Sequence, residues 1–184
     1  MNNISIQLRP GVNNVSQWQG VERKRAVPDK IRKQVLARDD FTCASCNHRA
    51  TKWMHIHHIA DEENEELDNL VTICPACHAV MYFGRSMQFG SLQIWKSSVL
   101  QIEIVRRTRD GIRRGLTLAD INATFALERG KLAPESMQWA NDLLASIGAD
   151  PRAELPEPLC AVFVDFKQWQ VDVAFNPDPL RRAL

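Results

Sequence analysis

The stretch CASCNHRATKWMHIHHIADEENEELDNLVTICPACHAVMY, residues 43–82, decides the fold. It contains four of the five cysteines of the chain and all five histidines. Cys43 and Cys46 form one CxxC pair, and Cys74 and Cys77 form a second. Two thiolate pairs at this spacing are the ligand set of a tetrahedral zinc site. Because four cysteines fill the coordination sphere, we expect this zinc to hold the fold and to take no part in chemistry.

A single CxxC pair is also typical of a redox dithiol, but two pairs favour structural zinc. Any reaction chemistry must then come from the histidines. The segment TKWMHIHHI, residues 51–59, is predicted to be the second strand of a hairpin whose first strand leads out of the Cys43 turn. Residues 70–73 are interpreted as a short apolar link to the second CxxC pair, where Pro75 suits a helix start. Successive side chains on a strand point to opposite faces, so His57 and His58 suit one metal ligand and one base better than two ligands of one ion. Histidine titrates near neutrality, as a general base must.

The string HIHHI, followed by LDNLVTICPACH, resembles the HNH (ββα-metal) endonuclease family in its zinc-containing form. The resemblance covers roughly residues 38–83 and implies an α+β fold with a zinc-braced, treble-clef-like ββα-metal core. It also implies that His57 is a metal ligand and that His58 is the general base that activates water. Asn69 would tie down the loop and orient His58, and His78 would be the second metal ligand, on the helix that follows.

The activity implied by this resemblance is hydrolysis of DNA phosphodiesters. It needs a second divalent metal (Mg²⁺, Mn²⁺, Ni²⁺ or Zn²⁺) besides the structural Zn²⁺. Two histidine ligands leave coordination positions open for phosphate oxygens and water. Arg38, followed by Asp39, resembles the arginine that commonly precedes the first CxxC pair in the family, and we expect it to be structural. His48 and His55 are assigned no role.

A second interpretation keeps the fold and discards the activity. The loop DEENEELD, residues 61–68, places six carboxylates beside the expected phosphate site, where they oppose the approach of a polyanion. Tyr82 stands where many family members carry a further histidine or asparagine. The whole-chain layout, from RDDFTCASC through NLVTICPACH to SLQIW, is similar to the IcmJ/DotN proteins of type IVB secretion. That similarity implies an inactive zinc-binding adaptor that binds protein partners in a secretion or conjugation coupling complex. The intact histidine constellation favours the nuclease.

The composition is that of an ordinary globular protein of 184 residues, with a net charge of +1 that argues neither for nor against nucleic acid. Residues 22–38 are basic, and Pro28 suits a helix start. This helix is a candidate for phosphate contact, with a solvated helix face as the alternative. The candidate contact residues are Arg23, Lys24, Arg25, Arg32 and Lys33.

The chain is predicted to divide at residue 91 into an N-terminal helix with the zinc core, 1–91, and a mainly helical extension, 92–184. Residues 4–8 are predicted to form a short strand, and SLQIW is predicted to be either a short strand or a lead-in. The expected helices begin near Ser97, at Thr117 and at Pro134, and end near Gly111, Arg129 and Ile147. The first of them is expected to face inward with Val99, Leu100, Ile102 and Val105. The five arginines between residues 106 and 114 are interpreted as cations expected at a helix C-terminus, with phosphate contact as the alternative.

The last apolar run, residues 160–175, has strand composition and either joins a sheet or packs as an arm. Cys160 lies in it and is expected to be a small core residue. The sequence contains no signal peptide and no long apolar run. Together with reduced zinc thiolates, this predicts a cytoplasmic protein without membrane insertion.

Overall fold

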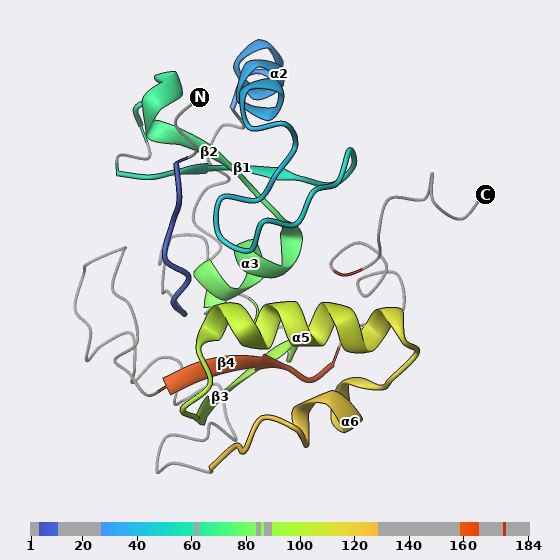
Figure 1. Ribbon diagram of the computed structural model, residues 1–184. Coiled ribbons are helices and arrows are strands. Elements are labelled where there is room, and N and C mark those ends of the chain that lie inside the picture. Colours follow the sequence, from blue (N-terminus) through green and yellow to red (C-terminus); the bar gives the residue numbers. More distant parts are fainter. Residues whose placement is uncertain are drawn as a thin grey trace, which may run out of the picture.

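The computed structural model describes residues 4–10, 27–60, 63–83, 86, 90–128, 159–165 and 175. Within these ranges the protein is a mixed α and β structure with two small sheets (Figure 1). This agrees with the predicted α+β class. In the part of the chain that is described, no helix has the length and apolar character needed to cross a membrane.

The first sheet pairs β1 (His55–His58) with β2 (Leu70–Ile73) in antiparallel register, so that His55 faces Ile73 and His58 faces Leu70. The short 3-10 helix η1 (Leu67–Asn69) leads into β2, and α3 (Pro75–Met81) follows it. Pro75 starts α3 as predicted, because the first helical position needs no backbone N–H donor.

The partner of β1 differs from the prediction. The sequence places a strand directly after the Cys43 turn and reads residues 70–73 as a link, whereas the structure has only an isolated bridge between Thr42 and Arg49 there. All four residues of β2 are buried. A strand buried on both faces shows no apolar-polar alternation, so its sequence pattern does not distinguish it from a link.

Helix α2 (Asp29–Arg38) begins directly after Pro28, as predicted, and packs on β1, β2 and η1. Residues 22–26 of the predicted basic helix lie outside the described residues. Residues 4–8, predicted as a strand, have no regular secondary structure. Their described backbone contact is a single hydrogen bond from Ile6 N to Ala44 O, and one such bond does not make a ladder.

The second sheet pairs β3 (Leu92–Lys96) with β4 (Leu159–Phe163), also antiparallel. Of the two predictions for SLQIW, the strand is confirmed, and the last apolar run contributes its first residues to this sheet. Helices α5 (Gln101–Arg113) and α6 (Leu118–Asn122) pack on β4. Helices α5 and α6 also pack against each other. In Figure 1, α3 and the β3–β4 sheet appear on opposite sides of α5.

The two faces of β4 belong to two different cores. Cys160 and Val162 pack with Ile104, Ile121 and Phe125 of the α5–α6 layer. Ala161 and Phe163, on the other face of β4, pack in the core that contains the four cysteines of the CxxC pairs. That core takes side chains from both sides of residue 91, while the predicted domain division itself stays a prediction.

The helices of the extension differ from the predictions at their ends. Helix α5 starts at Gln101 rather than Ser97, and Leu100, predicted to point inward, is 65% exposed. The helix also continues through Gly111 to Arg113. A Cβ at Gly111 would lie 2.5 Å from the side chain of Ile121, so this glycine permits close packing of α6 and does not stop α5.

Helix α6 starts at the predicted cap, where Thr117 and Asp120 form a capping box, but it ends at Asn122 instead of Arg129. The helix predicted for residues 134–147 lies outside the described residues. Cys160 is a core residue as predicted, 2% exposed, and burial raises the pKa of its thiol to about 11.

Candidate metal centre and the neighbouring histidines

The four cysteines of the two CxxC pairs converge on one point. Their Sγ atoms all lie within 4.8 Å of one another, and all four residues are buried. The Sγ atoms of Cys46 and Cys74, which belong to different pairs, are 3.5 Å apart. Among the described residues, no other group of three or more histidine, cysteine or acidic ligands comes together. The chain therefore has four cysteines positioned to bind a metal.

Local backbone structure holds each pair in place. In the first pair, Cys43 N donates to His48 O and Asn47 N donates to Cys43 O, closing a tight turn in which Asn47 has φ 59°. Asparagine adopts this left-handed conformation more readily than most residues. In the second pair, Cys74 is the N-cap of α3, and its Sγ accepts a hydrogen bond from Cys77 N at 3.5 Å.

The electrostatics of the cluster disfavour four thiolates without a counter-charge. Burial raises the pKa of Cys74 well above its ordinary value, and hydrogen bonding among the thiols, led by that with Cys43, does the same for Cys77. Hydrogen bonds from the neighbouring cysteines lower the pKa of Cys46. Four buried sulfurs at this spacing do not all ionise by themselves, so a bound cation is what would let all four act as thiolates.

A buried arginine completes the centre. Arg109 of α5 is 4% exposed and donates from Nη1 to Cys46 Sγ at 3.4 Å and from Nη2 to Cys74 Sγ at 3.3 Å. Burial works against its charge, but the sulfurs of Cys74 and Cys46 outweigh burial and raise the pKa of Arg109. The sequence analysis interpreted this arginine as one of the cations expected at a helix C-terminus, whereas the structure buries it against the sulfurs of the cysteine cluster.

A signal for Arg109 was present in the sequence. It lies four residues after buried Val105, on the same face of α5. An arginine on the apolar face of a helix must find a buried acceptor, because an unpaired buried charge is costly. With no acidic residue predicted inside the core, the thiolates are the remaining candidates.

The histidines form a second cluster, to which α3 contributes His78. His78 stacks on His55, with ring centroids 4.3 Å apart, and on Tyr82, also at 4.3 Å. The Tyr82 ring meets His57 edge-on at 6.0 Å. The two predicted metal ligands, His57 and His78, therefore lie on one side of β1, around Tyr82. His58, the next residue along the strand, points to the opposite face.

The sequence interpretation missed the position of His55, which was assigned no role. Alternation along β1 places it on the face of His57, and its ring lies against His78. Burial, with a smaller effect of Arg32, lowers its pKa. His48 lies in the turn of the first CxxC pair, where its carbonyl accepts from Cys43 N, and burial lowers its pKa to about 4.

Asn69 braces the loop that joins the two strands of the first sheet. Its Oδ1 accepts from Ala60 N at 2.8 Å, and its Nδ2 donates to Asn64 O at 2.7 Å. Its backbone carbonyl accepts from Ile59 N. These contacts agree with the expectation that Asn69 ties down the loop, while orientation of His58 by Asn69 stays a prediction.

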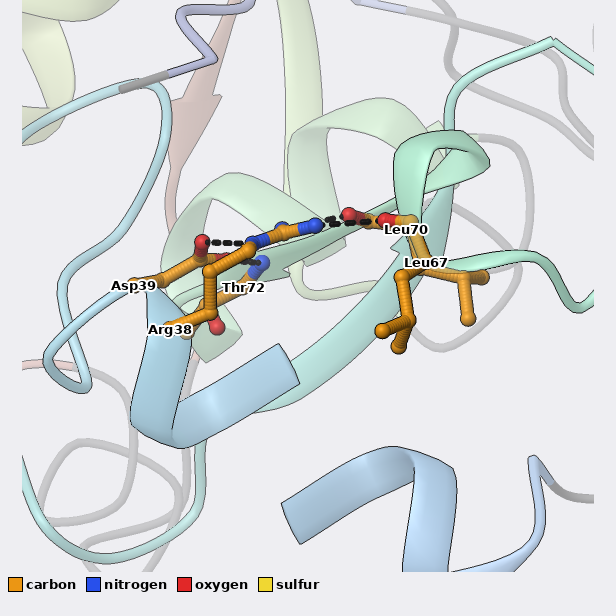
Figure 2. A network of polar contacts seen from close by, with 5 residues as sticks. All are labelled: Arg38, Asp39, Leu67, Leu70 and Thr72. Atoms are coloured by element: carbon orange, nitrogen blue, oxygen red, sulfur yellow. Dashed lines mark hydrogen bonds and ion pairs between the residues drawn. The ribbon is translucent and has the colours of Figure 1, made fainter. Parts of the chain in front are cut away.

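Arg38 and Asp39 join α2 to the same loop and strand. Figure 2 shows the Arg38 guanidinium between the Asp39 carboxylate and the carbonyls of Leu67 and Leu70. Asp39 Oδ2 accepts from Thr72 N at 2.8 Å. The structural role predicted for Arg38 is what the geometry shows. It bonds to backbone carbonyls at the end of the acidic loop.

Of the predicted phosphate contacts, the structure describes two. Arg32 donates to Met54 O and so ties α2 to the residue before β1, whereas Lys33 is exposed. The remaining three, Arg23, Lys24 and Arg25, lie outside the described residues. Of the acidic loop, Glu63, Glu66 and Asp68 are exposed.

Comparison with models of known protein families finds no match, and a search of curated proteins finds none either. The fold and the site define the class: a small α+β protein with a buried four-cysteine metal site beside a cluster of histidines.

Proposed function

We propose that this chain is a zinc-braced, metal-dependent endonuclease of the HNH type that hydrolyses DNA phosphodiesters. One observation carries the proposal: β1, β2 and α3 follow one another as a ββα unit that gathers His57 and His78 around Tyr82. His58 is adjacent on the strand, at the end where the Asn69-braced loop begins.

In this proposal Cys43, Cys46, Cys74 and Cys77 bind zinc, because an all-thiolate set with this compact spacing suits zinc and leaves no open position for substrate. Zinc there is structural. Catalysis belongs to the histidine cluster, to which α3 contributes His78.

His57 and His78 would hold a second divalent ion, with water and phosphate oxygens as the other ligands. Such an ion, when bound, supplies Lewis-acid stabilisation of the phosphate and of the leaving oxygen. His58 accepts a proton from the attacking water, a role that suits an imidazole near neutral pH. Asn69 keeps the loop after His58 in place through Ala60 N and Asn64 O.

The test is cleavage of supercoiled plasmid by the purified chain with Mg²⁺, Mn²⁺, Ni²⁺ or added Zn²⁺. His58→Ala should lower the rate by about 10²–10⁴-fold, the usual contribution of a general base, while its zinc content stays at the wild-type value. His48→Gln, in the turn of the first cysteine pair, is the matched histidine control and should cleave normally. Absence of cleavage with every metal, by folded and zinc-loaded wild type, would exclude the nuclease.

A second candidate is a catalytically inactive adaptor, similar to the IcmJ/DotN proteins, that binds protein partners of a secretion or conjugation coupling complex. It is favoured by the surface next to the histidines. Glu63, Glu66 and Asp68 are exposed there, together with the apolar side chains of Ile59 and Leu67, which are 37% and 41% exposed. Carboxylates mixed with apolar groups suit a basic protein surface better than DNA.

Charge reversal of the three carboxylates separates the two candidates. For the adaptor, lysine at positions 63, 66 and 68 should abolish capture of coupling-complex proteins, and His58→Ala should leave capture intact. For the nuclease, the same lysine substitutions should tighten DNA binding, because they remove like charge beside the phosphate site.

A further inference from the structure

Arg109 bridges the two halves of the metal site. Cys46 belongs to the first CxxC pair and Cys74 to the second, and the two guanidinium nitrogens donate to one sulfur of each. The planar fork of an arginine fixes two such donors at once, which the point charge of a lysine does not. The guanidinium therefore holds the pairs together from outside the coordination sphere.

The charge of the centre explains why an arginine is needed. Four thiolates around one divalent zinc carry two excess negative charges, and all four cysteines are buried. Buried charge without compensation is strongly unfavourable. Arg109 is itself 4% exposed and cancels one of the two charges within hydrogen-bonding distance of the sulfurs.

Packing fixes the arginine at this position. Val105, one turn earlier on α5, belongs to the same core as the four cysteines. Gln101, one turn before that, bonds through its side chain to both backbone groups of Ala161 in β4. Helix α5 is thus attached at its start to the second sheet and near its end to the metal centre.

We infer that Arg109 is the charge-compensating partner of the zinc tetrathiolate and the link between this centre and α5, so that zinc retention and docking of α5 stabilise each other. The inference goes beyond the proposed function, because it holds equally for a nuclease and for an adaptor.

The test is the rate of zinc release from the full chain to the chromogenic chelator 4-(2-pyridylazo)resorcinol. Arg109→Met keeps the length and apolar stem of the side chain and removes both donors and the charge. It should lower zinc affinity by about 10–100-fold, as loss of groups that hydrogen-bond to metal ligands typically does, and release zinc correspondingly faster. Arg113→Met is the matched control: it removes the same charge one turn later, at an exposed position paired with Asp110. It should release zinc at the wild-type rate.

Replacing zinc with cobalt gives a spectroscopic measurement that would not change if Arg109 only stabilised the fold. Hydrogen bonds to a thiolate stabilise the sulfur lone pairs, so removing them should shift the sulfur-to-cobalt charge-transfer bands of Arg109→Met to longer wavelength. The bands of Arg113→Met should stay where the wild type has them. If Arg109→Met does not fold, Arg109→Lys is compared with Arg113→Lys, and only the change at 109 should accelerate release. The inference would be overturned if the chain substituted at Arg109 released zinc at the wild-type rate and kept the wild-type band positions. It would also be overturned if substitution of Arg113 changed zinc release and the bands as much as substitution of Arg109 did.

Discussion

The unit formed by β1, β2 and α3 and the unit formed by β3, β4, α5 and α6 are stabilised in different ways. The first has two four-residue strands and a seven-residue helix, and it depends on polar braces: the four cysteines, Asn69, and the Arg38–Asp39 network. The second is joined by apolar packing around Phe125 and β4. The first unit also contributes apolar side chains to the larger core, but its elements are short, and polar staples add stability to short elements.

The two units are also continuous. The cysteines and Phe163 of β4 share one core, and Arg109 of α5 bonds to the metal-site sulfurs. The comparison therefore predicts graded effects: metal-site changes should affect the whole chain, and changes in the far core should leave the metal in place.

The largest effect is expected for Cys77→Ser, which removes one ligand. Structural zinc supplies about 10–16 kcal/mol in small zinc-finger peptides, as much as the entire stability of a typical domain, about 5–15 kcal/mol. The variant should lose zinc and cooperative thermal unfolding, measured by metal analysis and circular dichroism. Cys160→Ala, at the buried cysteine outside the site, should keep one zinc. If Cys77→Ser held no zinc and still unfolded cooperatively, the first unit would not depend on the metal, and the comparison would be wrong.

Next in size is Phe125→Ala in the core between α5, α6 and β4. Phe125 is fully buried, so the cavity should cost about 3–5 kcal/mol. Urea denaturation measures the loss, and Leu116→Ala, at a side chain 41% exposed, should change stability by about 0.5 kcal/mol or less. The folded Phe125→Ala chain should still hold one zinc. Concurrent loss of zinc and stability would show that the two units are not separable in this way.

A smaller effect is expected for Arg38→Ala. The change removes the bonds to Leu67 O and Leu70 O and leaves Asp39 without its cation. Loss of charged hydrogen bonds of this kind should cost about 1.5–3 kcal/mol in the same denaturation experiment. Arg49→Ala is the control, because its ion pair with Asp40 is exposed and should contribute about 1 kcal/mol at most. Equal losses of stability in Arg38→Ala and Arg49→Ala would contradict the claim that Arg38 braces the loop and β2.

The smallest effect is expected for Thr117→Ala at the start of α6. The change removes the capping box with Asp120 and should cost about 1 kcal/mol. Ala119→Ser, on the exposed surface of the same helix, controls for substitution within α6 and should cost less. Hydrogen exchange of α6 amides reports the change locally. The hydrogen-exchange protection of the β1 and β2 amides should stay unchanged. A change in their protection would show that the two units are more tightly coupled than this comparison assumes.

Sequence patterns were most informative where local chemistry dominates. The CxxC pairs, Pro28, Pro75 and Thr117 each specify a ligand or a helix start through a short-range requirement, and the structure has the four cysteines together and the helices starting there. The histidine alternation likewise specifies which side of β1 each ring occupies. What these rings do chemically stays a prediction.

The remaining features depend on contacts between distant segments. The pairing of β1 with β2 is decided by burial of residues 70–73 on both faces, and the reach of α5 past Gly111 is decided by Ile121. The contact of Arg109 with sulfur depends on how α5 packs against the two CxxC pairs. None of these features is encoded in a window of a few residues. The position of Arg109 on the apolar face of its helix did, however, indicate that this arginine has a buried partner.

The measurement that tests the central claim most directly is zinc-edge X-ray absorption on the purified full chain, together with its metal content. The account predicts one zinc per chain surrounded by four sulfurs at about 2.3 Å. A histidine nitrogen in the shell at about 2.0–2.1 Å, or a folded chain that holds no zinc, would contradict the claim that the four cysteines form the structural centre of this protein.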